Sequence, residues 1–251
     1  AGVVILNNNL TVNVSGASAI TGNVTGGAFG ITKTGPGTLT LSGTNSYTGT
    51  TAINGGTLKL GSASALPATA PLSMASLGVL DLNGFNATTT NVSASATTNT
   101  IIDNSVGAGT STFTVSAQVN TIGAIIRDGA TRTVAVAVAN ANLGAAMFTL
   151  TNGNTFSGGL TLLNTAGGTR LFVNGLVSTI GTAGAIVSSP FGRGPIIIGQ
   201  AATDKAGIYL ATVANNTIHN DIVFNTNLGT DRRGIRVDTI GNTLTGKITV
   251  N

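Results

Sequence analysis

Short runs in which apolar and polar residues alternate recur along the whole chain, separated by Gly and Asn. Examples are GTLTLSG from Gly37, GTLKLG from Gly56, STFTVS from Ser111 and KITVN from Lys247. A period of two places successive side chains on opposite faces of a β-strand, and Gly and Asn favour the turns between strands. No helical pattern intervenes between these runs, so the sequence predicts an all-β fold.

One of these patterns is repeated. NSYTGTTAIN at residues 45–54 returns as NTFSGGLTLL at 154–163 and as NTLTGKITVN at 242–251. Pro71 and Pro195 each precede an apolar strand, after the first and second copies respectively. We therefore expect one continuous solenoid over residues 1–251, with divergent units at about 29–140 and 141–241 and a third that starts at 242. The sequence is interpreted as a segment of a longer chain.

Regular short strands are also compatible with a sandwich or a barrel. A β-solenoid is favoured because the repeat is periodic in sequence, because apolar and polar positions alternate, and because the sequence stops within a repeat motif. Coils of strand-stacking solenoids take roughly 20–25 residues and stack at about 4.8 Å. On that basis the chain makes about ten coils and a rod on the order of 50 Å long.

The segment GITKTGPGTLTLSGTNSYTGTTAINGGTLKL resembles the passenger-associated repeat of bacterial autotransporters and related large surface proteins. The positions that carry this resemblance are Lys33, Gly35, Gly37, Leu39, Leu41, Gly43, Asn45, Tyr47, Gly49, Thr51, Ile53, Gly56, Thr57 and Leu58. The second copy departs from the pattern with Phe156 in place of Tyr and Leu160 in place of Thr. The resemblance implies a single-stranded right-handed parallel β-helix, located on the bacterial cell surface or outside the cell.

Composition narrows the classes of function. Charged residues are 7% of the chain, against roughly 25% in an average globular protein, and Thr, Ser, Asn and Gly must wet the surface instead. The absence of Cys excludes disulfides and thiolate metal sites. The net charge of +4 is diluted, without the dense basic stripe and aromatics of nucleic-acid binding, so no nucleic acid is expected. Apolar runs such as GPIIIG are too short for a transmembrane helix.

The strongest candidate for chemistry is a set of aspartates spaced about one coil apart. Asp81, Asp103 and Asp128 would stack into a carboxylate ladder if the coils are in register. β-Helical lyases of the pectate-lyase type bind Ca²⁺ on such ladders beside an Arg, and hard cations need several oxygen ligands. The alternative is that IID at 101–103 aligns with IIR at 125–127. That alignment places Arg127 over Asp103 as a charge-compensated surface stack.

Other candidates have a structural alternative beside the functional one. His219 is the single histidine and lies two residues before Asp221, which fits a surface strand beside a turn. The cluster DRRGIRVD holds Arg232, Arg233 and Arg236, which would grip a sulfated or phosphorylated glycan or form a solvated edge. Most aromatics are expected in the core. Phe191 is the exception, because its Pro- and Gly-bounded loop would expose it together with Arg193.

These observations predict a structural bacterial protein of the cell surface or the extracellular space. It would form a rod or fibre segment, as a stalk, an adhesin passenger or a filament or surface-layer building block, without catalysis. No catalytic, cofactor-binding or metal-binding residue is assigned. The expected partners are neighbouring repeats of a longer chain, identical subunits stacked end to end, or a host or glycan surface. The alternatives are a β-helical polysaccharide lyase or hydrolase that uses stacked Asp with Arg, and a phage-type receptor-binding fibre.

Overall fold

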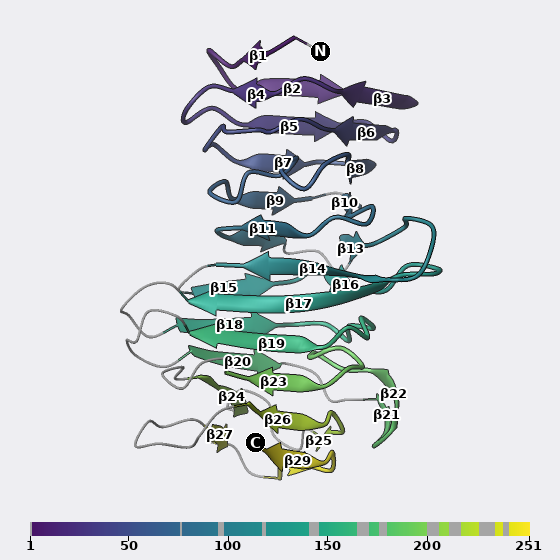
Figure 1. Ribbon diagram of the computed structural model, residues 1–251, viewed down its shortest axis with the longest axis vertical. Helices are drawn as coiled ribbons and strands as arrows, with labels where there is room; N and C mark the ends of the chain where they lie inside the picture. Colours follow the sequence, from purple (N-terminus) through teal and green to yellow (C-terminus); the bar gives the residue numbers. More distant parts are fainter. Residues whose placement is uncertain are drawn as a thin grey trace.

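Strands stacked in parallel form a β-solenoid in this computed structural model, with N and C at opposite ends of the stack (Figure 1). The structure describes residues 2–75, 77–94, 98–116, 119–140, 146–164, 171–175, 180–199, 206–210, 217–225, 234–237 and 241–251. Within these ranges all regular elements are strands. The predicted all-β solenoid is therefore confirmed.

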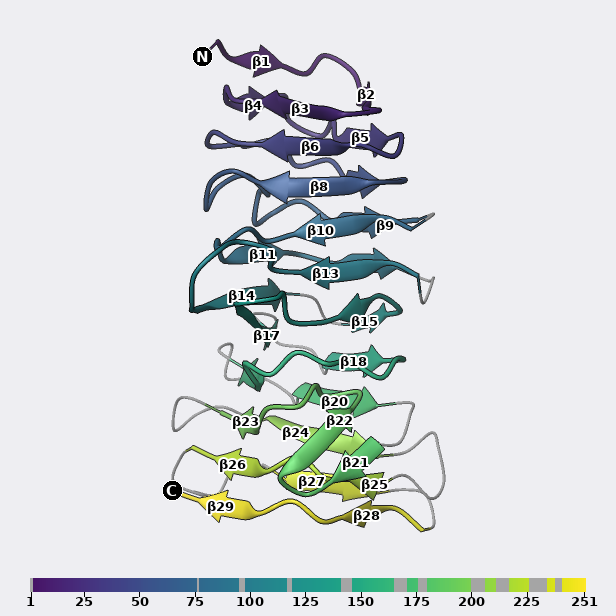
Figure 2. The ribbon, with the colours of Figure 1, turned by 90° about the vertical axis from the view of Figure 1, so that its right-hand side faces the viewer.

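The longest sheet contains ten strands and runs through most of the solenoid. Its members are β2 (Leu10–Asn13), β5 (Ile31–Thr34), β7 (Thr51–Ile53), β9 (Leu72–Met74), β12 (Val92–Ala94), β15 (Val119–Ile122), β18 (Ala146–Leu150), β20 (Leu171–Gly175), β24 (Ala206–Leu210) and β27 (Gly234–Val237). Each strand pairs in parallel with the strand one coil away, so the backbone ladder runs along the length of the stack (Figure 2).

Two further sheets form the other sides of the solenoid. The six-stranded sheet holds β3 (Ala17–Ile20), β6 (Thr38–Leu41), β8 (Thr57–Leu60), β10 (Val79–Asp81), β13 (Thr100–Ile102) and β16 (Ile125–Ile126). The seven-stranded sheet holds β11 (Ala87–Thr89), β14 (Thr110–Val115), β17 (Thr133–Asn140), β19 (Leu160–Asn164), β23 (Ile196–Ile198), β26 (Ile222–Phe224) and β29 (Ile248–Val250). The central coils visit the three sheets in turn, as β9, β10 and β11 do before β12 begins the next coil.

Short two-stranded pairings complete the described strands. β1 (Val4–Ile5) pairs in parallel with β4 (Val24–Thr25), and β25 (Thr217–Ile218) pairs in parallel with β28 (Thr243–Leu244). β21 (Ile180–Thr182) and β22 (Ala185–Ser188) differ from all of these because they form an antiparallel hairpin. The hairpin lies beside the stack rather than within one of its three sheets (Figures 1 and 2).

Coil length is regular in the first part of the chain and longer afterwards. Leu10 pairs with Ile31 and Thr51 with Leu72, each 21 residues further along, within the predicted range. Leu171 pairs with Ala206, 35 residues further along, because the hairpin is inserted in this coil. The predicted coil length is therefore wrong for the later coils, where extra residues leave the stack without interrupting it.

The interior of the solenoid is a continuous apolar column. In β6, Leu39 and Leu41 are buried while Thr38 and Thr40 face outward. The same alternation in β8 buries Leu58 and Leu60 directly beside them in register. Each coil thus places its aliphatic side chains on those of the coils above and below, which removes apolar surface from water along the whole rod.

The copies of the repeat motif lie on different faces. The first copy leads into β7 of the ten-stranded sheet, whereas the second and third lead into β19 and β29 of the seven-stranded sheet. The first two copies share one local feature. A buried Asn (Asn45, Asn154) is followed two residues later by a fully buried aromatic (Tyr47, Phe156). The motif is therefore a corner unit that leads the chain into a strand. The division into units at 29–140 and 141–241 stays a prediction.

Tyr47 shows how tightly this corner is packed. Its ring is fully buried, and its hydroxyl shares a hydrogen bond of 2.7 Å with Thr51 Oγ1. Burial disfavours the phenolate and raises the pKa of Tyr47 to about 12, although the bond to Thr51 acts in the opposite direction. The neutral hydroxyl therefore serves as a fixed polar contact inside the first copy of the motif.

Lys33 is a buried cation in the same segment. Its Nζ donates hydrogen bonds to the carbonyl oxygens of Thr34 at 3.1 Å, Gly35 at 2.8 Å and Gly55 at 2.9 Å. Gly55 belongs to the next coil, so the ammonium group joins two successive turns. Burial lowers the pKa of Lys33 below its ordinary value, since the charged form loses solvation. The residue looks like a surface lysine in sequence but acts as a link between coils.

Replacing Lys33 with Met should destabilise the solenoid, because three carbonyl groups lose their shared donor while the apolar stem is kept. We expect the free energy of unfolding to fall by about 1–3 kcal/mol, measured by urea denaturation. The control is Lys59→Met, since Lys59 lies on the outward face of β8. That control should change the free energy of unfolding by less than about 0.5 kcal/mol. Equal stability of the two variants would contradict the proposed role of the ammonium group.

Candidate functional site

The three aspartates predicted to stack lie along one side of the six-stranded sheet, at or just after the C-terminal ends of its strands. Asp81 is the last residue of β10, Asp103 directly follows β13, and Asp128 lies two residues after β16. Ile101 pairs with Ile126, so Asp103 and Asp128 occupy equivalent positions in successive coils. Asp81 pairs with Ile102 and is therefore one residue out of step. The predicted three-member ladder is wrong in register, although the three residues share one edge.

The predicted stacking of Arg127 on Asp103 is also wrong. It assumed that Ile101 lies beside Ile125, but Ile101 lies beside Ile126, which shifts the alignment by one residue. Arg127 comes directly after Ile126, the partner of Ile101, and is therefore one residue short of the position beside Asp103. Its side chain is exposed. The cation that reaches Asp103 is Arg132, with its Nε 3.0 Å from Oδ2. The loop between β16 and β17 supplies this arginine.

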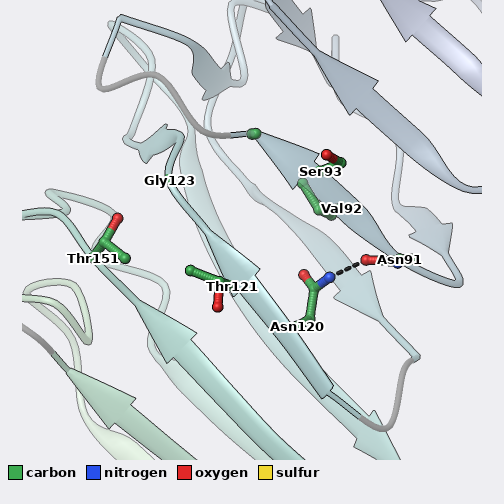
Figure 3. A pocket seen from close by; sticks show the side chains of 8 residues that line it. Asn91, Val92, Ser93, Asn120, Thr121, Gly123 and Thr151 are labelled. Atoms are coloured by element: carbon green, nitrogen blue, oxygen red, sulfur yellow. Dashed lines mark hydrogen bonds between the residues drawn. The ribbon is translucent and has the colours of Figure 1, made fainter. Parts of the chain in front are cut away.

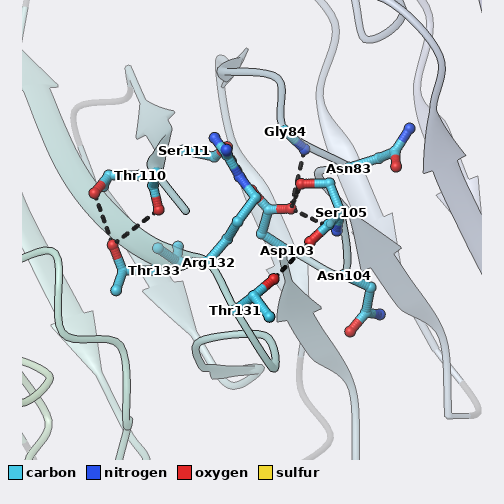
Figure 4. Close-up of polar contacts among 12 residues, drawn as sticks. Asn83, Gly84, Asp103, Asn104, Ser105, Thr110, Ser111, Thr131, Arg132 and Thr133 are labelled. Carbon is cyan, nitrogen blue, oxygen red and sulfur yellow. Dashed lines mark hydrogen bonds and ion pairs between the residues drawn. The ribbon is translucent and has the colours of Figure 1, made fainter. Parts of the chain in front are cut away.

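Asp103 is the centre of a polar cluster that joins three coils (Figure 4). Its Oδ1 accepts hydrogen bonds from the backbone N–H of Gly84, in the preceding coil, and from the N–H and hydroxyl of Ser105. Its Oδ2 accepts from the hydroxyl of Ser111 and from Nε of Arg132, in the following coil. The carboxylate is 0% exposed. Both oxygens are therefore occupied by groups of the chain itself.

The ionisation of Asp103 follows from these contacts. Burial alone raises the pKa of a carboxyl group, because the charged form loses solvation. Hydrogen bonds from Ser111 and Ser105 and the contact with Arg132 act against burial, and their combined effect leaves the pKa of Asp103 below its ordinary value. The folded protein therefore stabilises the ionised form of this carboxylate.

Asp128 and Asp81 make the same kind of contact with the coils that follow. Oδ1 of Asp128 accepts from the backbone N–H of Val134 and Ser157, and Oδ2 accepts from the Ser157 hydroxyl at 2.6 Å. Arg193 Nη2 adds an ion pair at 3.0 Å to the same oxygen.

Oδ1 of Asp81 accepts from the N–H of Asn104, one coil further on, at 2.9 Å. These carboxylates tie coils together where the strands stop. Across the described ranges, no group of three or more His, Cys, Asp or Glu side chains is arranged to hold a metal ion.

Buried asparagines perform the same task at other corners, and the sequence reasoning missed this role. Asn45 accepts a hydrogen bond from the N–H of Val24, one coil before, and donates to the carbonyl of Ala65, one coil after. Asn154 likewise accepts from Ile126 and donates to Pro190. The sequence signal was present, because both residues begin a copy of the repeat motif.

A polar depression on the ten-stranded sheet lies between β12 and β15, with a volume of about 470 Å³ (Figure 3). Asn91, Ser93, Asn120 and Thr121 line it together with Thr151 from the coil that follows. The amide of Asn120 donates to Asn91 Oδ1, while its own buried Oδ1 has no partner among the described residues. The site offers uncharged hydrogen-bonding groups and no ionisable side chain.

The remaining candidates lie in different environments. Phe191 is 0% exposed, so the prediction that its loop exposes it is wrong. Its ring belongs to the apolar core, where Phe156 is also buried. Arg193 is exposed, as expected. His219 is partly exposed beside the turn after β25, and its Nδ1 contacts Thr245 Oγ1.

The other aromatics largely confirm the expectation that they lie in the core. Those buried there, or packed against it, are Phe29, Tyr47, Phe85, Phe113, Phe148, Phe156 and Phe224. The predicted arginine cluster falls mostly outside the described residues, which exclude Arg232 and Arg233. The backbone of Arg236 lies in β27 opposite Tyr209.

Comparison with known families identifies the segment that contains the first motif copy. Residues 31–60 match the model of the passenger-associated-transport-repeat, which confirms the resemblance carried by that segment. No curated protein and no solved structure was found to match the chain. Within the described ranges, no helix is long and apolar enough to cross a membrane.

Replacing Asp103 with Asn should destabilise the protein near neutral pH, because Arg132 and two serine hydroxyls lose a charged acceptor. We expect a loss of about 2–4 kcal/mol in the free energy of unfolding at pH 7. The pKa of Asp103 is lowered in the folded state, so this contribution is fully present above the unfolded-state pKa of about 3.9. It is lost as the pH falls through the folded-state pKa.

The difference in stability between the wild type and D103N should therefore shrink in acid, as measured by denaturation at several pH values. Asp221→Asn is the control, because Asp221 is exposed. This substitution should change the free energy of unfolding at pH 7 by less than about 0.5 kcal/mol. A D103N deficit that stays constant down to pH about 2 would contradict the role of the ionised carboxylate.

Proposed function

We propose that this chain is a non-catalytic rod segment of a bacterial protein located on the cell surface or outside the cell. The observation that carries the proposal is the combination of a passenger-associated-transport-repeat at residues 31–60 with a parallel solenoid along the chain. The repeat type and the fold together suggest a passenger-type structural protein. Its task would be to hold one end of the rod at a distance from the other, as a stalk, an adhesin body or part of a surface layer.

The use of polar groups supports a structural rather than a catalytic role. Asp103 is enclosed by five donor contacts, and Asp128 is held by Ser157 and Arg193. The ammonium group of Lys33 donates hydrogen bonds to three backbone carbonyls. A general acid or base must reach the proton that it transfers. These side chains instead face other coils of the same chain.

The outermost strands suggest the kind of partner that such a rod would have. Ile5 in β1 is 68% exposed, and Ile248 and Val250 in β29 are 50% and 53% exposed. Strands at the edge of a stack also present unpaired backbone groups to further strands. We propose that neighbouring coils of a longer chain, or a second copy of this chain, cover these strands.

Labelling of intact cells tests the proposed location. Antibodies raised against the purified 251-residue chain should bind unpermeabilised cells of the source organism or detect the protein in the culture medium. A cytoplasmic enzyme should be labelled only after permeabilisation and serves as the control. Labelling of this protein only after permeabilisation would overturn the proposed location.

An assay of polysaccharide cleavage tests the proposed absence of catalysis. The purified chain, incubated with polygalacturonate and Ca²⁺ or with neutral glucans, should release neither unsaturated products nor new reducing ends. A characterised pectate lyase provides the positive control. Product release that persists through repeated purification and disappears in R132Q would support the lyase alternative, because Arg132 is the arginine beside Asp103.

A further inference from the structure

The antiparallel hairpin β21–β22 forms one side of a cleft on the outside of the stack. The strands of the seven-stranded sheet before and after the hairpin keep their register, since Leu160 to Leu162 in β19 pair continuously with Ile196 to Ile198 in β23. The hairpin lies outside the three long sheets (Figure 2). The space between the hairpin and the corner residues before β19, β23 and β26 has a volume of about 410 Å³. Small-ligand sites occupy roughly 300–1,000 Å³.

Four separate segments line this cleft. The hairpin contributes Ile186, the corner before β19 contributes Ser157, and the loop before β23 contributes Arg193 and Pro195. The turn between β25 and β26 adds His219 and Asp221. Along β22 the side chains alternate, so that Ile186 is half-buried toward the cleft while Val187 is 61% exposed on the other face.

The polar groups of the cleft are anchored but retain bonding capacity. Arg193 uses Nε on the Thr155 carbonyl and Nη2 on Asp128, which leaves further guanidinium N–H groups. Oδ1 of Asp221 accepts from the N–H of Lys247, and the carboxylate has a second oxygen. The contact of His219 with Thr245 is made through Nδ1, which leaves Nε2.

We propose that this cleft binds a neutral saccharide. The charges of Arg193 and Asp221 oppose each other, and Asp128 reduces the positive charge further. A strongly anionic ligand therefore gains little from the site. Sugar hydroxyl groups both donate and accept hydrogen bonds, which suits Arg193, His219 and Asp221 together. The C–H face of a sugar ring would pack on Ile186 and Pro195.

The expected affinity is weak. None of the described residues that line the cleft is aromatic, so they do not provide the stacking that strengthens many sugar sites. It is also open on one side, and a bound sugar would keep part of its hydration. We therefore expect a dissociation constant of about 1–10 mM, corresponding to about 3–4 kcal/mol of binding free energy. Such a site suits multivalent attachment by many copies, each of which binds weakly.

The single histidine provides a direct probe of this site, because His219 is the only one in the chain. The full chain labelled with ¹³C-histidine should give one set of imidazole signals. We propose to titrate chitotriose, cellotriose and maltotriose separately to about 20 mM at constant pH, well above the expected dissociation constant. At least one trisaccharide should shift the His219 signal saturably. A sulfated heparin tetrasaccharide should bind more weakly than that trisaccharide.

Two variants on opposite faces of β22 make the matched comparison. Ile186→Glu should weaken binding at least tenfold, because a charge enters the apolar side of the cleft, whereas Val187→Glu should leave the dissociation constant within about twofold. Asp221→Asn, which keeps the shape of the side chain, should weaken binding about threefold or more. Thermal unfolding of each variant checks that the fold is retained.

Three results would overturn the proposal. They are the absence of a saturable shift with all three trisaccharides, tighter binding of the sulfated tetrasaccharide, and equal weakening by Ile186→Glu and Val187→Glu. The saccharide proposal does not rest on the rod function. Cell labelling tests the proposed location and sugar titration tests the saccharide site, so a negative result in one experiment does not contradict the proposal tested by the other.

Discussion

The architecture depends on one constraint, which is that backbone groups of each coil must find partners in the coils above and below. Along the strands the parallel ladders meet this requirement. At the corners the ladders stop, and buried N–H and C=O groups without partners would be costly. Side chains take over there: Asn45 and Asn154 link a coil to both of its neighbours, and Asp103 does so through a carboxylate. The chain has few charged residues, and charged side chains such as that of Asp103 serve to hold neighbouring coils together.

Much of the fold could be predicted from the sequence, because alternation with a period of two directly determines which residues of a strand face inward. The burial of Leu39, Leu41, Leu58 and Leu60 follows from that rule alone. Register could not be predicted in the same way. Ile101 has two isoleucines as possible partners in the next coil, and a shift of one residue decided that Arg132 rather than Arg127 meets Asp103. Nor does the local sequence show that Lys33 is buried, since its partners are carbonyl groups of two separate turns.

The repeat motif illustrates how sequence similarity and spatial equivalence can differ. The first copy leads into the ten-stranded sheet and the second into the seven-stranded sheet, yet each places an asparagine and an aromatic ring inside a corner. What the motif specifies is a local change of direction. Coils can therefore lengthen from 21 residues between Leu10 and Ile31 to 35 between Leu171 and Ala206 while the ladder continues. That tolerance is what allows the β21–β22 hairpin, and the cleft beneath it, to be added to an otherwise uniform rod.

The end of the six-stranded sheet has a mechanical consequence. Hydrogen bonds between coils point along the rod, so a pull on its two ends is carried at each coil boundary by the sheets that have strands there. Up to β16 that load is shared with the six-stranded sheet. In the coils just beyond, the described part of this side is held by the bridge between Asn154 and Ser189 and by side-chain bonds such as those of Asn154 and Asn220. Under tension the described strands therefore share the load among all three sheets only between β11 and β16, and among two sheets both in the coils around residues 31–60 and in those just beyond β16.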